Sequence, residues 1–95
     1  MEIDIFQKIE KDFGTEAKVA REELDILDAK TKGLIDNRLL RSIIYLAEGN
    51  IEKLKMYIAM ARLDWRDVLW QAEYDSPDDT MRKRDFNKTF LELGL

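Results

Sequence analysis

The hydrophobic and polar positions of this chain are patterned most clearly in its middle, in the stretch NRLLRSIIYLAEG at residues 37–49. On a helix with about 100° per residue, its apolar side chains fall within an arc of roughly 160°. These side chains are Leu39, Leu40, Ile43, Ile44, Leu46 and Ala47. Asn37 is a favourable N-cap and Gly49 is a favourable C′ residue. One neighbouring helix cannot cover so wide an arc, so the pattern predicts a helix at the centre of the fold.

Two helices are predicted before this central helix. The first covers residues 2–13 and ends at Gly14. Thr15 is expected to cap the second, which covers about residues 16–30. Lys32-Gly33 is expected to close it, because a cation followed by glycine suits a helix C-terminus. The apolar faces of the two helices consist of Ile3, Ile5, Phe6, Ile9 and Phe13, and of Ala17, Ala20, Leu24 and Leu27.

Two more helices are predicted after the central one. Asn50 is expected to cap a helix of residues 51–63, and Asp64 is expected to begin another at residues 65–75. The short connection at Gly49-Asn50 makes the first of these an antiparallel neighbour of the central helix. The inward-facing residues are predicted to be Ile51, Leu54, Tyr57, Ile58 and Ala61, and Trp65, Val68, Leu69 and Ala72.

The chain breaks at Ser76-Pro77, where a serine N-cap followed by proline favours one or two helical turns over residues 77–84. Residues 85–95 keep helical spacing in Phe86, Phe90 and Leu93 but are too few to predict a stable helix.

The predicted fold class is therefore all-α: a single domain, residues 1–95, formed by one small bundle of about five helices and a short C-terminal extension. Residues 1–77 make the helical core, and residues 78–95 make the extension, for which docking back on the core is one arrangement. The third, fourth and fifth predicted helices are expected to pack in sequence as an antiparallel trio. The first two helices would then cover the remaining face.

The composition of the chain excludes several classes of function. The chain has 95 residues, 45% of them hydrophobic, with no cysteine, no histidine and a formal charge of −4. Thiol chemistry is excluded, and so is the side chain that most often acts as a base or metal ligand near neutral pH. We expect no nucleic acid partner, because no segment is strongly basic, and no membrane partner, because no apolar run approaches about 20 residues. The absence of cysteine and of a secretory signal suggests a cytoplasmic protein.

Few residues of the chain are candidates for metal binding or catalysis. The acids Glu73, Asp75, Asp78 and Asp79 are the best metal candidates, but EYDSPDD lacks the acid spacing and glycine of a calcium loop. We interpret them as a solvated, capping loop. Arg41 is expected to form an ion pair with Asp64 or Asp67, which would orient helices. The sequence thus predicts no catalytic, cofactor-binding or metal-binding residue, and no cofactor.

A protein-contact patch is predicted at Arg66, Trp70 and Tyr74, extended by Met56 and Met60. Arginine and aromatic residues are enriched at binding hot spots, and methionine gives adaptable surface. The alternative is that the tail folds back and covers these rings, an arrangement that we favour. A second subunit could provide the same cover. The tail residues concerned are Phe86, Phe90 and Leu91.

A second apolar stripe is formed by Val19 and Ile26, one heptad apart and outside the main seam of their helix. Two interpretations stay open: two partly exposed side chains, or a narrow second contact surface.

The segment RLLRSIIYLAEGNIEKLKMYIAMARLDWRDVLWQAEYD, residues 38–75, resembles a family of small bacterial all-helical proteins. That family combines an arginine-rich central helix, a Leu-Ala-x-Gly turn and an Arg-Asp-Val…Ala-Glu-Tyr ending. The matching positions are Arg41, Leu46, Ala47, Gly49, Arg66, Asp67, Val68, Ala72, Glu73 and Tyr74. The resemblance implies a bacterial, cytoplasmic, helical protein, and it implies no activity.

These observations favour a non-enzymatic protein-interaction module, with a protein partner or a second copy of itself as a homodimer. One alternative is a small acidic inhibitor or immunity-type protein that binds a basic enzyme by charge complementarity. Another is a metal-dependent helical hydrolase, which would require acidic side chains that face each other.

Overall fold

The computed structural model describes residues 1–31, 35–76, 78 and 80–95, and it has the predicted all-α class. No strand is present in these ranges. Within the described ranges, four α-helices have more than ten residues, a fifth is a single short turn, and one 3-10 turn joins the first two. In order they are α1 (Ile3–Phe13), the 3-10 turn η1 (Gly14–Glu16), α2 (Ala17–Lys30), α3 (Asn37–Ala47), α4 (Ile51–Glu73) and α5 (Phe90–Leu93).

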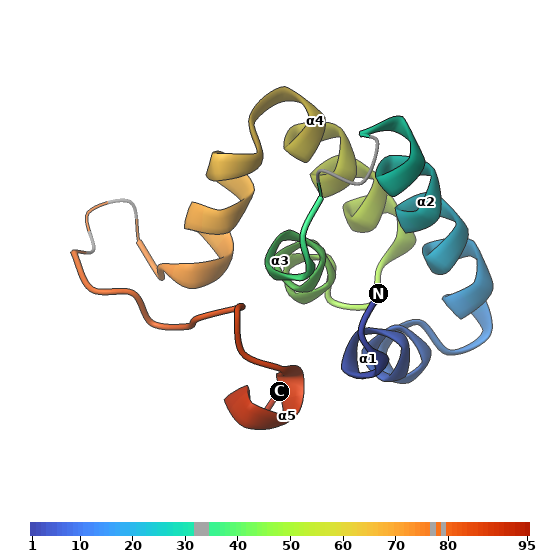
Figure 1. Cartoon of the computed structure of the whole chain (residues 1–95), viewed down its shortest axis with the longest axis horizontal. Coiled ribbons are helices and arrows are strands. Elements are labelled where there is room, and N and C mark those ends of the chain that lie inside the picture. The colour runs from blue at the N-terminus through green and yellow to red at the C-terminus, as the bar shows by residue number, and fades with distance from the viewer. Residues whose placement is uncertain (32–34, 77, 79) are drawn as a thin grey trace.

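Helix α3 lies at the centre of the fold, as its wide apolar arc predicts. It is seen nearly end-on in Figure 1, with α4 arching over it and α1 beside it. Helix α2 packs against α1 and α4, and α5 packs against α1. The buried residues of α3 include two polar ones, Arg41 and Ser42. The other buried residues of this helix are Leu39, Leu40, Ile43, Ile44 and Ala47.

The N-terminal end of α3 differs from the prediction, whereas the C-terminal end agrees with it. The N-cap is Asp36, whose carboxylate accepts a hydrogen bond from the Leu39 amide at 2.9 Å. Asn37 is the first helical residue, and its side-chain amide donates to Glu2 at 3.0 Å. The predicted C′ position of Gly49 is correct, since its φ is +73°. A Cβ there would lie 2.3 Å from the Asp12 carbonyl oxygen, so the close approach of α1 also requires glycine.

The connection between α1 and α2 differs from the prediction, because it is a 3-10 turn of three residues. Thr15 lies inside the 3-10 turn η1 and does not cap α2, which follows Glu16 without a side-chain cap. The short turn keeps the two helices side by side on one edge of the molecule (Figure 1). The predicted close of α2 at Lys32-Gly33 lies outside the described residues.

Helix α4 combines the predicted fourth and fifth helices. Its N-cap is Asn50, as predicted, which accepts from the Lys53 amide at 2.9 Å. Asp64 has non-helical backbone angles (φ −153°, ψ 96°) and accepts from the Arg66 amide at 3.1 Å, so it bends the helix where the sequence predicted a new one. The prediction that Trp65 faces inward is wrong. The bend at Asp64 resets the helical phase, and Trp65 is 51% exposed.

The C-terminal segment folds back over α1 and α3. Phe86 and Phe90 are both buried, with ring centroids 5.2 Å apart for Tyr45–Phe86 and 6.1 Å apart for Phe86–Phe90. Thr89 and Glu92 form a capping box that supports the single turn of α5. The helical turns predicted for residues 77–84 are absent at 78 and 80–84; Pro77 lies outside the described residues.

Candidate functional site

A buried arginine joins three separate parts of the chain. The Arg41 side chain, 1% exposed, donates to both carboxylate oxygens of Asp4 at 2.9 and 3.0 Å and pairs with Glu2 at 3.0 Å. It also donates to the Phe86 carbonyl oxygen at 3.1 Å. Asp4 in turn accepts from the Phe90 amide at 3.0 Å. Arg41 therefore fixes α1 and the C-terminal segment to α3.

The predicted partners of Arg41 are wrong. Asp64 lies at the bend of α4, and Asp67 is an exposed residue that lines a groove along its second half. The acidic first turn of α1 is the nearer source of carboxylates, because α1 packs against α3.

Glu73, which is 1% exposed, forms a second buried ion pair with Arg38. Arg38 donates to both of its carboxylate oxygens, and the Phe86 amide donates at 2.9 Å. The Glu73 carbonyl oxygen accepts from the amides of Lys83 and Arg84 at 2.8 and 3.2 Å. Glu73, taken from sequence as part of an acidic loop, is instead an internal anchor of the C-terminal segment.

The acid cluster considered as a metal site does not come together at one point. Glu73 is held by Arg38, and Asp75 accepts from Arg84 at 2.6 Å. Over the ranges that the structure describes, no group of three acidic side chains is arranged around a common point. Asp79 lies outside those ranges.

The protonation of these groups follows from their contacts. Burial raises the pKa of Asp4, but the hydrogen bonds from Arg41 and from the Phe90 amide outweigh it and hold that pKa below its usual value. The hydrogen bond to Asp4 raises the pKa of Arg41, and the hydrogen bond to Glu73 raises the pKa of Arg38. These ion pairs and hydrogen bonds join α1, α4 and the C-terminal segment to α3.

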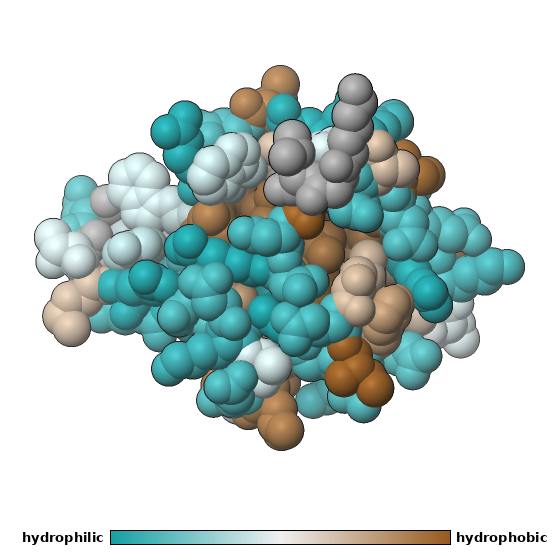
Figure 2. Space-filling view, in the orientation of Figure 1, coloured by the Kyte–Doolittle hydropathy of each residue, from teal (hydrophilic) through white to brown (hydrophobic). Residues whose placement is uncertain are grey.

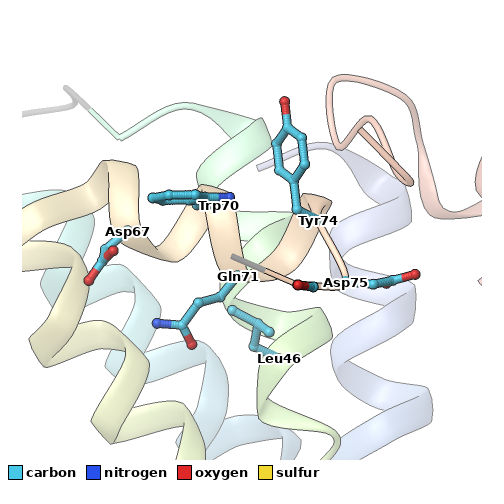
Figure 3. Close-up of a pocket in the computed structure, with 7 residues that line it drawn as sticks. Leu46, Asp67, Trp70, Gln71, Tyr74 and Asp75 are labelled. Carbon is cyan, nitrogen blue, oxygen red and sulfur yellow. The ribbon is translucent and has the colours of Figure 1, made fainter. Parts of the chain in front are cut away.

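An open groove lies between α3 and the second half of α4 (Figure 3). Its volume is about 460 Å³. The residues that line it are Leu46, Asp67, Trp70, Gln71, Tyr74, Asp75 and Ser76. Residues 67, 70, 71 and 74 follow the i, i+3, i+4, i+7 spacing of one helical face.

The aromatic side chains of this groove are not covered by the C-terminal segment. Trp70 is 46% exposed and Tyr74 is partly exposed, and no residue of 85–95 lines the groove. The prediction that the tail covers these rings is therefore wrong. Phe86 and Phe90 cover Tyr45 and α1 instead, and Leu91 points to solvent. The physical reason is that Arg41 and Glu73 hold the tail backbone on the other side of α3.

The structure brings together only part of the predicted patch. Trp70 and Tyr74 share the groove, and Gln71 donates to the Met60 sulfur at 3.3 Å, which places Met60 at its border. Met56 is exposed but does not line the groove. Arg66 lies 5.7 Å from the centroid of the Trp65 ring and points away from Trp70's groove.

Five of the seven groove residues were not part of the predicted contact patch: Leu46, Asp67, Gln71, Asp75 and Ser76. Asp67 and Gln71 could have been found, because they share a helical face with Trp70. Leu46 could not, because its role depends on how α3 crosses α4. Val19 is 42% exposed and Ile26 is 49% exposed, so both interpretations of this stripe stay open.

The face of the molecule drawn in Figure 2 is mainly polar. Figure 2 shows hydrophilic side chains over much of one face, with apolar side chains in smaller patches between them. No helix in the described part of the chain is both long and apolar enough to span a bilayer.

Comparisons with protein families, with curated proteins and with solved structures found no match. The resemblance of residues 38–75 to small bacterial helical proteins has no support from these comparisons and carries no argument below.

Proposed function

We propose that this chain is a non-enzymatic protein-interaction module whose contact surface is the groove of Trp70 and Tyr74. The observation that supports this most is that Trp70 stays half exposed beside a second aromatic ring, while the chain buries Phe13, Phe86 and Phe90 elsewhere. Tryptophan and tyrosine are the residues most enriched at binding hot spots. The expected location stays the cytoplasm.

The energy available at this surface is appreciable. A fully covered aromatic side chain buries about 150–250 Å². Covering the exposed part of Trp70 would remove roughly 100 Å² from water and favour association by about 2.5 kcal/mol, at about 25 cal/mol per Å². Tyr74 and Leu46 would add to this, so the groove is a favourable centre for a small interface.

The charged groups support a binding role over catalysis. The carboxylates of Asp4 and Glu73 are each held by an arginine, and in the groove Asp75 is paired with Arg84 at 2.6 Å. A metal-dependent hydrolase would need converging acids, and Glu73 is not available for that purpose because Arg38 occupies it.

Self-association is one form of the proposal. Size-exclusion chromatography with light scattering at low and high concentration distinguishes a monomer from a dimer. Trp70→Ala and Trp65→Ala form a matched pair, because both side chains are about half exposed and only Trp70 lines the groove. If the groove mediates a dimer, W70A dissociates it and W65A does not.

A foreign partner is tested by placing a photo-crosslinking residue at position 71 inside the groove, with position 18 on α2 as the control site. The crosslinked partner is then purified and its affinity measured by calorimetry. We expect W70A to weaken binding about tenfold or more and W65A to leave it within about twofold. Equal crosslinking from both positions, or affinity that W70A leaves unchanged, would contradict the proposal.

A further inference from the structure

The groove combines aromatic rings with negative charge. Asp67 and Asp75 both line it, together with Trp70 and Tyr74. Figure 3 shows the two carboxylates on either side of the aromatic side chains. Asp75 pairs with Arg84 at 2.6 Å. Asp67 has no hydrogen bond or ion pair with any described residue, so its exposed carboxylate is available to a cation from outside.

One arginine of the chain already binds a carboxylate and an aromatic ring together. At the rim of the groove, Arg84 donates to Asp75 at 2.6 Å while its guanidinium lies 5.1 Å from the centroid of the Tyr45 ring. Its Nε also donates to the Ala72 carbonyl oxygen at 2.7 Å. One guanidinium is therefore held by a carboxylate and an aromatic face together.

Asp67 and Trp70 present the same two groups, one helical turn apart, without an arginine of the described chain between them. The nearest candidate in sequence, Arg66, lies over Trp65 instead and is 3.8 Å from Asp64.

We infer that the groove takes an arginine side chain from a segment of a partner protein, with its guanidinium between Asp67 and Trp70. The inference rests on the proposed function. Arginine suits the position better than lysine, because its planar guanidinium stacks on rings and reaches both oxygens of a carboxylate. The formal charge of −4 attracts a basic segment at longer range.

A protein segment fits the groove better than a free cation. The volume of about 460 Å³ lies within the range of about 300–1,000 Å³ typical of sites for drug-sized ligands. A guanidinium alone leaves much of that space empty. The Leu46 side chain and the Tyr74 ring provide apolar contacts for the neighbours of the arginine.

The test selects short random peptides displayed on phage against the wild-type chain, and keeps those that bind wild type and W65A but not W70A. We expect these peptides to share an arginine next to an apolar residue. Replacing that arginine by citrulline, which has the same shape without the charge, is expected to weaken binding about tenfold. Asp67→Asn should produce a similar loss, and higher salt should weaken binding to wild type.

The outcomes separate this inference from the proposed function. Peptides that bind through Trp70 but contain no cation, or that tolerate citrulline, overturn the arginine inference and leave the interaction module standing. A selection that yields no Trp70-dependent peptide counts against both. A dimer of the chain that W70A and Arg66→Ala both dissociate would make a second copy the occupant and would also overturn the inference.

Discussion

Arg41 and Asp4 are 37 residues apart in the sequence and form a bidentate ion pair, with nitrogen–oxygen distances of 2.9 and 3.0 Å. The pair is nearly inaccessible to solvent on the arginine side. Asp4 also accepts from the Phe90 amide, so the same carboxylate binds the C-terminal segment. One ion pair therefore holds three elements together, and it is the first place to test the fold.

Removing the arginine should destabilise the chain strongly. Arg41→Ala leaves Asp4 without its cation, and breaking a buried pair in this way typically costs about 3–5 kcal/mol. A small domain has only about 5–15 kcal/mol in total. Urea unfolding followed by circular dichroism measures the loss. The control is Arg66→Ala, whose exposed side chain should change stability by less than about 0.5 kcal/mol; equal losses would contradict the anchoring role.

The two phenylalanines of the C-terminal segment belong to the core. Phe86→Ala removes a fully buried ring and should reduce the free energy of unfolding by about 3–5 kcal/mol. Leu91→Ala, one residue after the buried Phe90, should leave it within about 0.5 kcal/mol because Leu91 is exposed. Thermal melts of the two variants give the comparison. If F86A melts at the wild-type temperature, the segment is not part of the core.

Acid should weaken the fold through Asp4. Its pKa in the folded chain is below the ordinary value of 3.8, because the hydrogen bonds from Arg41 and Phe90 outweigh the effect of burial. The unfolded chain therefore binds this proton more readily than the folded chain. The stabilisation is complete above pH 3.8 and is lost as the pH falls below it toward the folded pKa.

The variant Asp4→Asn isolates that acid response. Its urea midpoint should fall less between neutral and acidic pH than that of wild type, although D4N is less stable at neutral pH. Glu10→Gln, at an exposed position of α1, is the control and should keep the wild-type slope. A D4N profile parallel to wild type would mean that Asp4 does not set the acid response.

Alanine substitutions at two glycines would distinguish the cost of backbone strain from the cost of a steric clash. Gly49 and Gly94 have nearly the same positive φ, +73° and +72°, but only Gly49 has backbone atoms where a Cβ would go. Gly94→Ala should cost about 1–2 kcal/mol from the left-handed backbone alone. Gly49→Ala should cost clearly more, because α1 must move away from Asp12. Chemical denaturation of both variants gives the difference, and equal losses would show that the clash is relieved without cost.

The sequence predicted best those features that depend only on residues adjacent in the chain, such as helix caps and breaks. The Asn50 cap, the break at Asp64 and the left-handed Gly49 each follow from local backbone chemistry, and the structure has all three. The central position of α3 also followed, because its apolar arc is too wide for one partner. The error of one residue at Asn37 reflects competition with the adjacent Asp36 for the same cap, whereas Thr15 lies in a 3-10 turn and α2 has no side-chain cap.

Contacts between distant residues could not be predicted in this way. Arg41 had several acids to choose from, and only the packing of α1 on α3 selects Asp4. The packing site of the C-terminal segment could not be predicted for the same reason. The sequence indicates that Phe86 and Phe90 are buried, but it does not favour Tyr45 over Trp70 as their partner. The groove was predicted in part, since Trp70 and Tyr74 share a helical face, whereas Leu46 comes from another element.

The hydrogen bond from Phe90 to Asp4 has a practical consequence for protein engineering. It brings the Phe90 nitrogen to within 3.0 Å of an Asp4 carboxylate oxygen, although the two residues are 86 positions apart, so the first and last helices of the described chain lie side by side (Figure 1). A short linker could join them covalently, and the polypeptide could then be opened at another surface turn. Such a circular permutant is expected to keep the same core, and its two new ends could carry fluorescent labels far from the groove.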